Sequence, residues 1–141
     1  MMETPMDRID KILNHDLFLY HLGRNNAAEA DRRFCRHSMV HFLDVARIGT
    51  IIALEEGLKI NREWIYAAAL LHDCGKHEQY ENGIPHEQAS ARIAPEILKA
   101  CGFNDEETGV IVTAISRHRD PEAAKEKNLN GILYRADKAS R

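Results

Sequence analysis

The chain has 141 residues, of which 44% are hydrophobic and 29% are charged, and its formal net charge is −3. This length suits one domain with a core of its own, and the composition excludes a disordered chain, a fibre and a disulfide scaffold. A slightly acidic balance gives no positive field for nucleic acid or anionic lipid, so we expect neither as a partner.

The sequence predicts neither export nor a membrane span. Its first residues, MMETPMDRIDKIL, include acidic side chains, and no run of about 18 apolar residues occurs anywhere. Cys35, Cys74 and Cys101 lie far apart without a CxxC pair, which argues against a disulfide framework and a thiolate zinc site. We therefore expect a cytoplasmic protein without a membrane span.

Apolar residues recur at steps of three and four, and no alternation of period two is sustained. This pattern predicts an all-α fold, a compact helical bundle of about six or seven helices. Thr4 and Pro5 predict the start of a first helix that reaches about Tyr20. The sequence NAAE at 26–29 resembles a capping box and predicts a second helix start.

A longer helical pattern begins at Met39 and stops at Gly57, a residue that favours the left-handed conformation past a helix end. Asn61 can cap the next helix, which leads into the stretch AALLHDCGKH. The segment HEQYENGIP that follows contains Asn-Gly and Pro and predicts a loop. The apolar positions of the first pattern are Val40, Leu43, Ala46, Ile51 and Leu54.

Three further elements complete the chain. A helix is expected from about His86 to Ala100, which Pro95 must kink or restart. The sequence NDEE at 104–107 is a second capping-box pattern and opens a helix that reaches His118. Residues 119–128 are charged and predict a solvated loop, and NGILYRADKASR predicts the last helix.

The histidines are the most informative feature, because six of the eight lie between 37 and 118. Several occupy positions where a helical pattern requires an apolar side chain. A single buried histidine with one hydrogen bond is common in protein cores and needs no functional explanation. Several buried imidazoles together with two carboxylates, however, would leave charge unpaired at a cost of several kcal/mol. A shared divalent cation would satisfy them all. Histidine and carboxylate ligands without thiolate favour Fe, Mn, Zn, Co or Ni over Mg.

Neighbouring residues of a helix point about 100° apart, so His72 and Asp73 share one ion only if it lies between them. Two ions side by side relax this demand, because Asp73 has two oxygens and can offer one to each. The apolar run before His72 then carries the end of a helix to the centre of the fold, where it can hold metal.

The motifs resemble those of a known family. His41, the pair His72 and Asp73, and Asp137, in the contexts HFLDVARI, AALLHDCGK and RADK, resemble the HD superfamily of metal-dependent phosphohydrolases. The likeness covers about 36–138. It implies one HD domain over 1–141, with an N-terminal helical segment at about 1–35 and a metal-binding core at 36–138.

Members of this family that bind two ions have two additional histidines, and His86 and His118 occupy the matching places. The resemblance implies one or two divalent ions. The rival for the first position is His37, one turn before His41. The implied ligands are His41, His72, Asp73, His86, His118 and Asp137. Among the other histidines, His77 is expected in a loop or behind the ligands, and His15 and His21 at the surface or as caps.

The resemblance also implies hydrolysis of a phosphate ester or anhydride of a nucleotide-like small molecule by a metal-activated water. Asp73 and Lys76 are the expected catalytic residues, Asp73 orienting the water and Lys76 neutralising charge on the phosphate. The expected substrate-binding residues are Lys76, Arg117, Arg119 and Arg135, and Arg92 also lies near a ligand segment. Two alternatives remain, a mixed-valent di-iron oxygenase with the same ligands and a non-catalytic module that binds a nucleotide or metal.

Overall fold

The computed structural model describes residues 6–29 and 39–140, and every regular element in these two ranges is helical. The predicted all-α fold is therefore confirmed. The elements are α1 (Asp7–Leu13), α2 (Asp16–Ala28), α3 (Met39–Glu55), α4 (Arg62–Leu71), α5 (Lys76–Asn82), α6 (His86–Ala100), α7 (Asp105–Ser116), the 3₁₀ helix η1 (Pro121–Lys125) and α8 (Leu129–Ala139).

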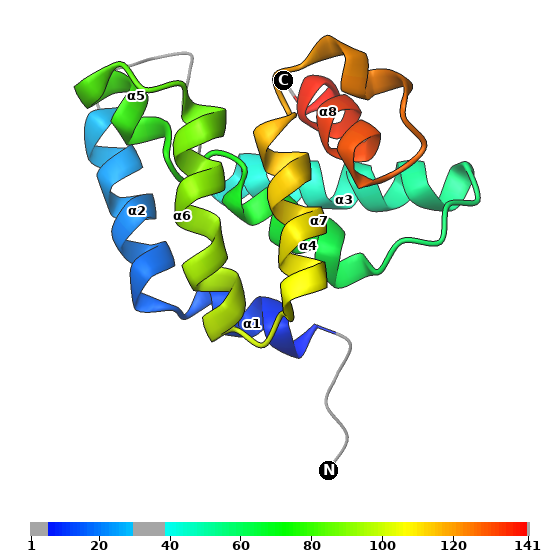
Figure 1. The fold of residues 1–141 in the computed structure, drawn as a ribbon, viewed down its shortest axis with the longest axis horizontal. Helices are drawn as coiled ribbons and strands as arrows, with labels where there is room; N and C mark the ends of the chain where they lie inside the picture. The colour runs from blue at the N-terminus through cyan, green and yellow to red at the C-terminus, as the bar shows by residue number, and fades with distance from the viewer. Residues whose placement is uncertain (1–5, 30–38, 141) are drawn as a thin grey trace.

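Helix α4 lies at the centre of the bundle and packs against α1, α3, α6, α7 and α8. In Figure 1, α2, α5 and α6 stand on one side of the view, α8 on the other, α7 lies between them, and α3 crosses behind. The apolar run 67–71 of α4 is completely buried. Its burial stabilises the fold and brings the polar pair that follows it to the middle of the molecule.

The helix ends predicted at Gly57, Asn61 and Asn104 agree with the structure. The Asn61 side chain accepts a hydrogen bond from the Glu63 N–H and caps α4. Asn104 and Glu107 form the predicted capping box of α7. Gly57 has a φ of +68° just past the end of α3. These signals were reliable because each is made within a few residues of the chain.

The predictions for the N-terminal part were wrong in two places. One helix reaching Tyr20 was expected, but the chain turns after Leu13, and the His15 side chain accepts from the Leu17 N–H to start α2. The sequence NAAE does not start a helix, since α2 runs through it to Ala28 and its C-cap is Glu29. The expected start at Thr4 and Pro5 lies outside the described residues.

The segment HEQYENGIP is not a loop, because most of it forms α5. The Asn-Gly signal marks only the end of this helix, where Gly83 adopts a φ of +70°. Helix α6 is not restarted at Pro95 but runs through it. Helix α7 ends at Ser116, two residues before His118. The expected loop 119–128 contains η1. The described residues therefore form more helices than the six or seven predicted, because the first helix is split in two and α5 replaces an expected loop.

One face of α3 differs from its predicted orientation. Val40, Ile51 and Leu54 were placed on the apolar pattern, but their exposed fractions are 69%, 53% and 75%. The buried face is formed by Phe42, Val45, Ala46, Gly49 and Ala53. The helix contains apolar residues on both faces, so periodicity alone did not select the buried one. None of the described helices is long and apolar enough to cross a membrane.

A pair of histidines joins α2 to α5. His21 Nδ1 lies 2.8 Å from His77 Nε2, and the two rings are stacked. Burial, and then the neighbouring His77, lower the pKa of His21 to about 4. Burial also lowers the pKa of His77, against the pull of Glu81. The pair therefore favours the neutral form in the folded protein.

This pair predicts a loss of stability in mild acid. In the unfolded chain His21 has an ordinary pKa near 6.5 and binds a proton at a pH where the folded protein keeps this side chain neutral. Stability should thus fall as pH drops from about 6.5 toward 4. Between pH 7 and pH 5 the free energy of unfolding should fall in both proteins. We expect this fall to be about 1 kcal/mol smaller in His21→Gln than in wild type, after allowance for the half-exposed ring. Urea unfolding at both pH values measures this, and equal losses in the two proteins would contradict it.

Candidate metal centre

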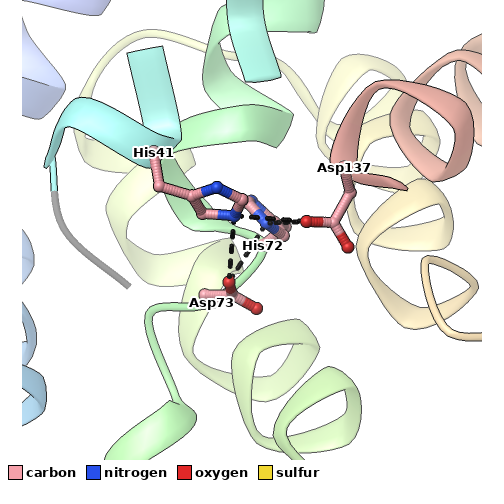
Figure 2. A group of neighbouring side chains, drawn as sticks. All are labelled: His41, His72, Asp73 and Asp137. Carbon is pink, nitrogen blue, oxygen red and sulfur yellow. Dashed lines mark ion pairs between the residues drawn. The ribbon is translucent and has the colours of Figure 1, made fainter. Parts of the chain in front are cut away.

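Four side chains from three parts of the chain meet at one point (Figure 2). His41 comes from α3, Asp137 from α8, and His72 and Asp73 from the turn after α4. His41 Nε2 lies 3.2 Å from Asp137 Oδ1 and 3.7 Å from Asp73 Oδ2. His72 Nε2 lies 3.2 Å from Asp73 Oδ2 and 3.5 Å from Asp137 Oδ1. We call these four residues the first ligand group.

A second ligand group begins at the other oxygen of Asp73. Asp73 Oδ1 lies 3.3 Å from His86 Nε2 and 3.4 Å from His118 Nε2, and the two ring nitrogens are 3.0 Å apart. His86 opens α6, and His118 lies in the turn after α7. Each group offers atoms close enough together to hold a metal ion. Asp73 belongs to both.

The distances between the ligand atoms suit a bound cation. Two ligand atoms that each lie about 2.1 Å from one ion are about 3.0–3.4 Å apart, and the distances within the two groups fall in or near this range. His72 Nε2 is buried and makes no well-formed hydrogen bond to the protein. A buried nitrogen of this kind is costly unless it receives a partner, which an ion would provide.

The ring nitrogens on the far side are already engaged. His72 Nδ1 lies 2.6 Å from the Ala69 carbonyl, and His118 Nδ1 lies 2.6 Å from the Ile115 carbonyl. His41 Nδ1 lies 3.0 Å from Ser140 Oγ. A carbonyl can only accept, so in His72 and His118 Nδ1 carries a proton and Nε2 is the ring nitrogen that faces the group. This is the arrangement by which proteins orient histidine ligands.

His86 is held in the same way by Gln79 of α5. Gln79 Oε1 accepts from the His86 backbone N–H at 3.0 Å and lies 2.8 Å from Nδ1 of the ring. One amide oxygen thus fixes both the start of α6 and the rotation of its first side chain. His86 Nε2 consequently points at Asp73.

Close packing between the turn and α6 brings the second group together. A Cβ atom on Gly75 would lie 2.7 Å from the Ala89 Cβ and from the Ser90 N. The Gly75 N–H also donates to Ser90 Oγ at 2.9 Å. No larger residue fits here, so glycine permits the approach of the helix that carries His86.

The charges of the site call for a positive ion. Burial raises the pKa of Asp73, but His72 and His118 outweigh it and hold that pKa well below its usual range. Burial would likewise lower the pKa of His72, yet the carboxylates of Asp73 and Asp137 raise it to about 10. Two buried carboxylates thus draw a proton onto a ligand nitrogen, and a divalent ion would replace that proton.

The predicted cations lie at different distances from the centre. Lys76 Nζ is 3.4 Å from His86 Nδ1 and 5.6 Å from the Tyr80 ring. Burial lowers the pKa of His86 to about 3 against the pull of Asp73, and Lys76 and Arg119 add to this effect. Arg119 is exposed and close enough for its charge to act on the ring. Both cations are near the second group.

The other three arginines have carboxylate partners. Arg117 pairs with Asp120 and Glu126, and Arg92 pairs with Glu78. Arg135 pairs with Glu56, just past the C-terminal end of α3. His41 lies near the opposite end of this 17-residue helix, which is about 25 Å long. The Arg135 guanidinium is therefore directed away from the two ligand groups.

The remaining histidines and cysteines among the described residues take no part in either group. His77 is buried in α5 and contacts His21, and His15 caps α2. Burial raises the pKa of the Cys74 thiol to about 12, so this neighbour of Asp73 remains protonated. Cys101 is also a free thiol. His37, the rival of His41, and Cys35 lie outside the described residues.

Sequence reasoning missed the residues that hold the ligands in place. Gln79 and Ser140 contact ligand rings, and Asn25 contacts the backbone of Asp73. Ser140 lies one helical turn after Asp137, which is a weak local signal for a shared face. Gln79 and Asn25 contact their partners through the tertiary fold, and nothing in their local sequence sets them apart from other polar residues.

Comparison with known proteins identifies a family to which this chain is similar. The family model described as the HD domain matches residues 39–141. An uncharacterized protein of Clostridium beijerinckii is 51% identical over 136 residues, which cover 96% of this chain and 85% of the relative.

A solved structure has a similar fold. It is the crystal structure of a predicted HD superfamily hydrolase from an uncultured Thermotogales bacterium, with a TM-score of 0.65 and 27% identity. The match covers 85% of this chain and 66% of the solved chain, so this chain spans just under two thirds of that relative.

The glycine contact predicts that the second ligand group is easier to disrupt than the first. Gly75→Ala should push α6 and His86 away from Asp73, because the clash is with backbone and cannot be relieved by a side-chain rotation. We expect the variant to lose one of two metal equivalents, measured by elemental analysis after dialysis. Gly109→Ala in α7, where a Cβ meets nothing within 4 Å, is the control and should keep both. Equal metal content in the two variants would contradict the prediction.

Proposed function

This chain belongs to the HD-domain family, and we propose that it is a metal-dependent hydrolase of phosphate esters or anhydrides, acting on a nucleotide-like small molecule. The observation that carries the proposal is Asp73, whose two oxygens each face a separate ligand group. A buried carboxylate between two sets of imidazoles suits a pair of divalent ions, with Fe, Mn, Zn, Co or Ni favoured by the donor atoms. The likeness to a predicted hydrolase supports the reaction class.

Divalent ions bound at the two groups would supply Lewis acidity toward a phosphoryl oxygen and lower the pKa of water. The chain itself keeps the ligand atoms in place. The Ala69 and Ile115 carbonyls hold protons on the far nitrogens of His72 and His118, and Gln79 holds His86. These contacts keep three imidazole donor atoms oriented before any substrate arrives, which is the kind of preorganisation that favours a charged transition state.

Lys76 is the residue we propose for phosphate binding and charge neutralisation. Its ammonium lies at the edge of the second group beside His86 and is half-buried. Arg119 is a second candidate, because its charge reaches the same ring. Arg117 and Arg135 were expected to share this role, but their contacts with Glu126 and Glu56 make them weaker candidates.

The proposal predicts turnover by protein loaded with Mn or Co under anaerobic conditions. Bis-p-nitrophenyl phosphate and a panel of nucleotides are suitable substrates. Asp73→Asn should reduce the rate to background, because it removes the charge that both groups share. Lys76→Met should lower kcat/KM by about 10–100-fold, as expected for one charge-assisted hydrogen bond. Lys127→Met, an exposed lysine whose charge acts on Glu56, is the matched control and should retain full activity.

Two results would contradict the proposal. Absence of turnover across the panel by fully loaded protein would favour a binding module. Activity that requires iron and consumes oxygen would favour the oxygenase alternative, which the same ligand types also allow.

A further inference from the structure

We infer that Asn25 of α2 is a positioning residue for the metal centre, and that the N-terminal segment therefore contributes to the site. Asn25 lies outside residues 39–141, the part that the family model matches. The inference rests on the metal centre of the proposed function but not on its substrate.

Asn25 bridges the two ends of the turn that carries Asp73. Its Nδ2 donates to the Asp73 carbonyl at 2.9 Å, and its Oδ1 accepts from the His77 N–H at 2.8 Å. The side chain is completely buried. Both polar atoms of the amide are thus satisfied inside the protein, one by the carbonyl of Asp73 in the turn and the other by the N–H of His77 in the first turn of α5.

The bridge replaces a helical hydrogen bond. In a continuous helix the N–H of His77 would bond the carbonyl of Asp73, four residues earlier. Here α4 has ended at Leu71 and α5 begins at Lys76, and the Asn25 amide is inserted between the two groups. The turn can consequently open without leaving a buried N–H or C=O unpaired.

The bridge also caps α5. The N-cap residue of this helix is Gly75, which has no side chain to accept from the first-turn N–H groups. Asn25 performs this function from another helix, because the His77 N–H is the second of these groups. Glycine is required at position 75 by the close approach of α6. A capping side chain therefore cannot be supplied locally.

The geometry of Asp73 depends on this arrangement. Its carbonyl accepts from both the Lys76 N–H, at 3.0 Å, and Asn25 Nδ2. These two bonds fix the peptide plane between Asp73 and Cys74, which contains the Cα atom that carries the Asp73 side chain. A rotation of this plane would move Oδ1 and Oδ2 away from their separate ligand groups. Partners behind a ligand commonly change metal affinity by about 10–100-fold when they are removed.

Cobalt titration tests this positioning role, because the visible absorption of bound Co(II) reports ligand geometry and not only folding. Asn25→Asp keeps the shape and the acceptor for the His77 N–H but loses the donor to the Asp73 carbonyl. Asn25→Leu loses both. Asn26→Ala, an exposed residue of the same helix, is the matched control. We expect Asn25→Asp to bind Co(II) about 10–100-fold more weakly than wild type with an altered spectrum, and Asn26→Ala to match wild type.

Each variant is checked by circular dichroism, and one that has lost its helices is replaced by Asn25→Ser, whose hydroxyl can keep one bond. Folded Asn25 variants with the wild-type cobalt spectrum and affinity would overturn the inference and leave Asn25 with a role in stability alone. Failure of wild type to bind cobalt would instead overturn the metal centre itself, so the two failures are distinguishable.

Discussion

The placement of the Asp73 carboxylate is the constraint on which the rest of this structure depends. Its two oxygens face different ligand groups, so the backbone at this point must be fixed in both position and rotation. The apolar end of α4 supplies the position, because burial of 67–71 carries the turn into the core. Helices α3, α6 and α8 then bring His41, His86 and Asp137 to it. Hydrophobic packing thus overcomes the cost of desolvating charged groups.

The sequence predicted the fold class and several helix ends for local reasons. Asn61 and the capping box at Asn104 act within one turn of the chain, so their signals can be read without knowing the fold. His41, His72, His118 and Asp137 stood out for a different reason, since polar residues at buried helical positions need a partner. The full set of six ligands followed only from the family resemblance. The structure brings them together in two groups, and their role as ligands stays a prediction.

What the sequence could not predict depends on tertiary contact. The segment 76–82 contains turn residues at its end, yet it is helical because it packs against α2 and α6. Asn25 and Gln79 are ordinary polar residues until the fold places them behind Asp73 and His86. The sequence analysis placed the N-terminal helical segment apart from the metal-binding core. Asn25 of α2 contacts the turn that carries Asp73, and this contact is the basis for the positioning role that we infer for it.

Anomalous diffraction from crystals of manganese-loaded protein tests the central claim most directly. The account predicts two peaks about 3.5–4 Å apart, one beside His41, His72 and Asp137, the other beside His86 and His118, with one Asp73 oxygen contacting each ion. A single peak that Asp73 does not contact, or none in protein soaked in excess metal, would contradict the account.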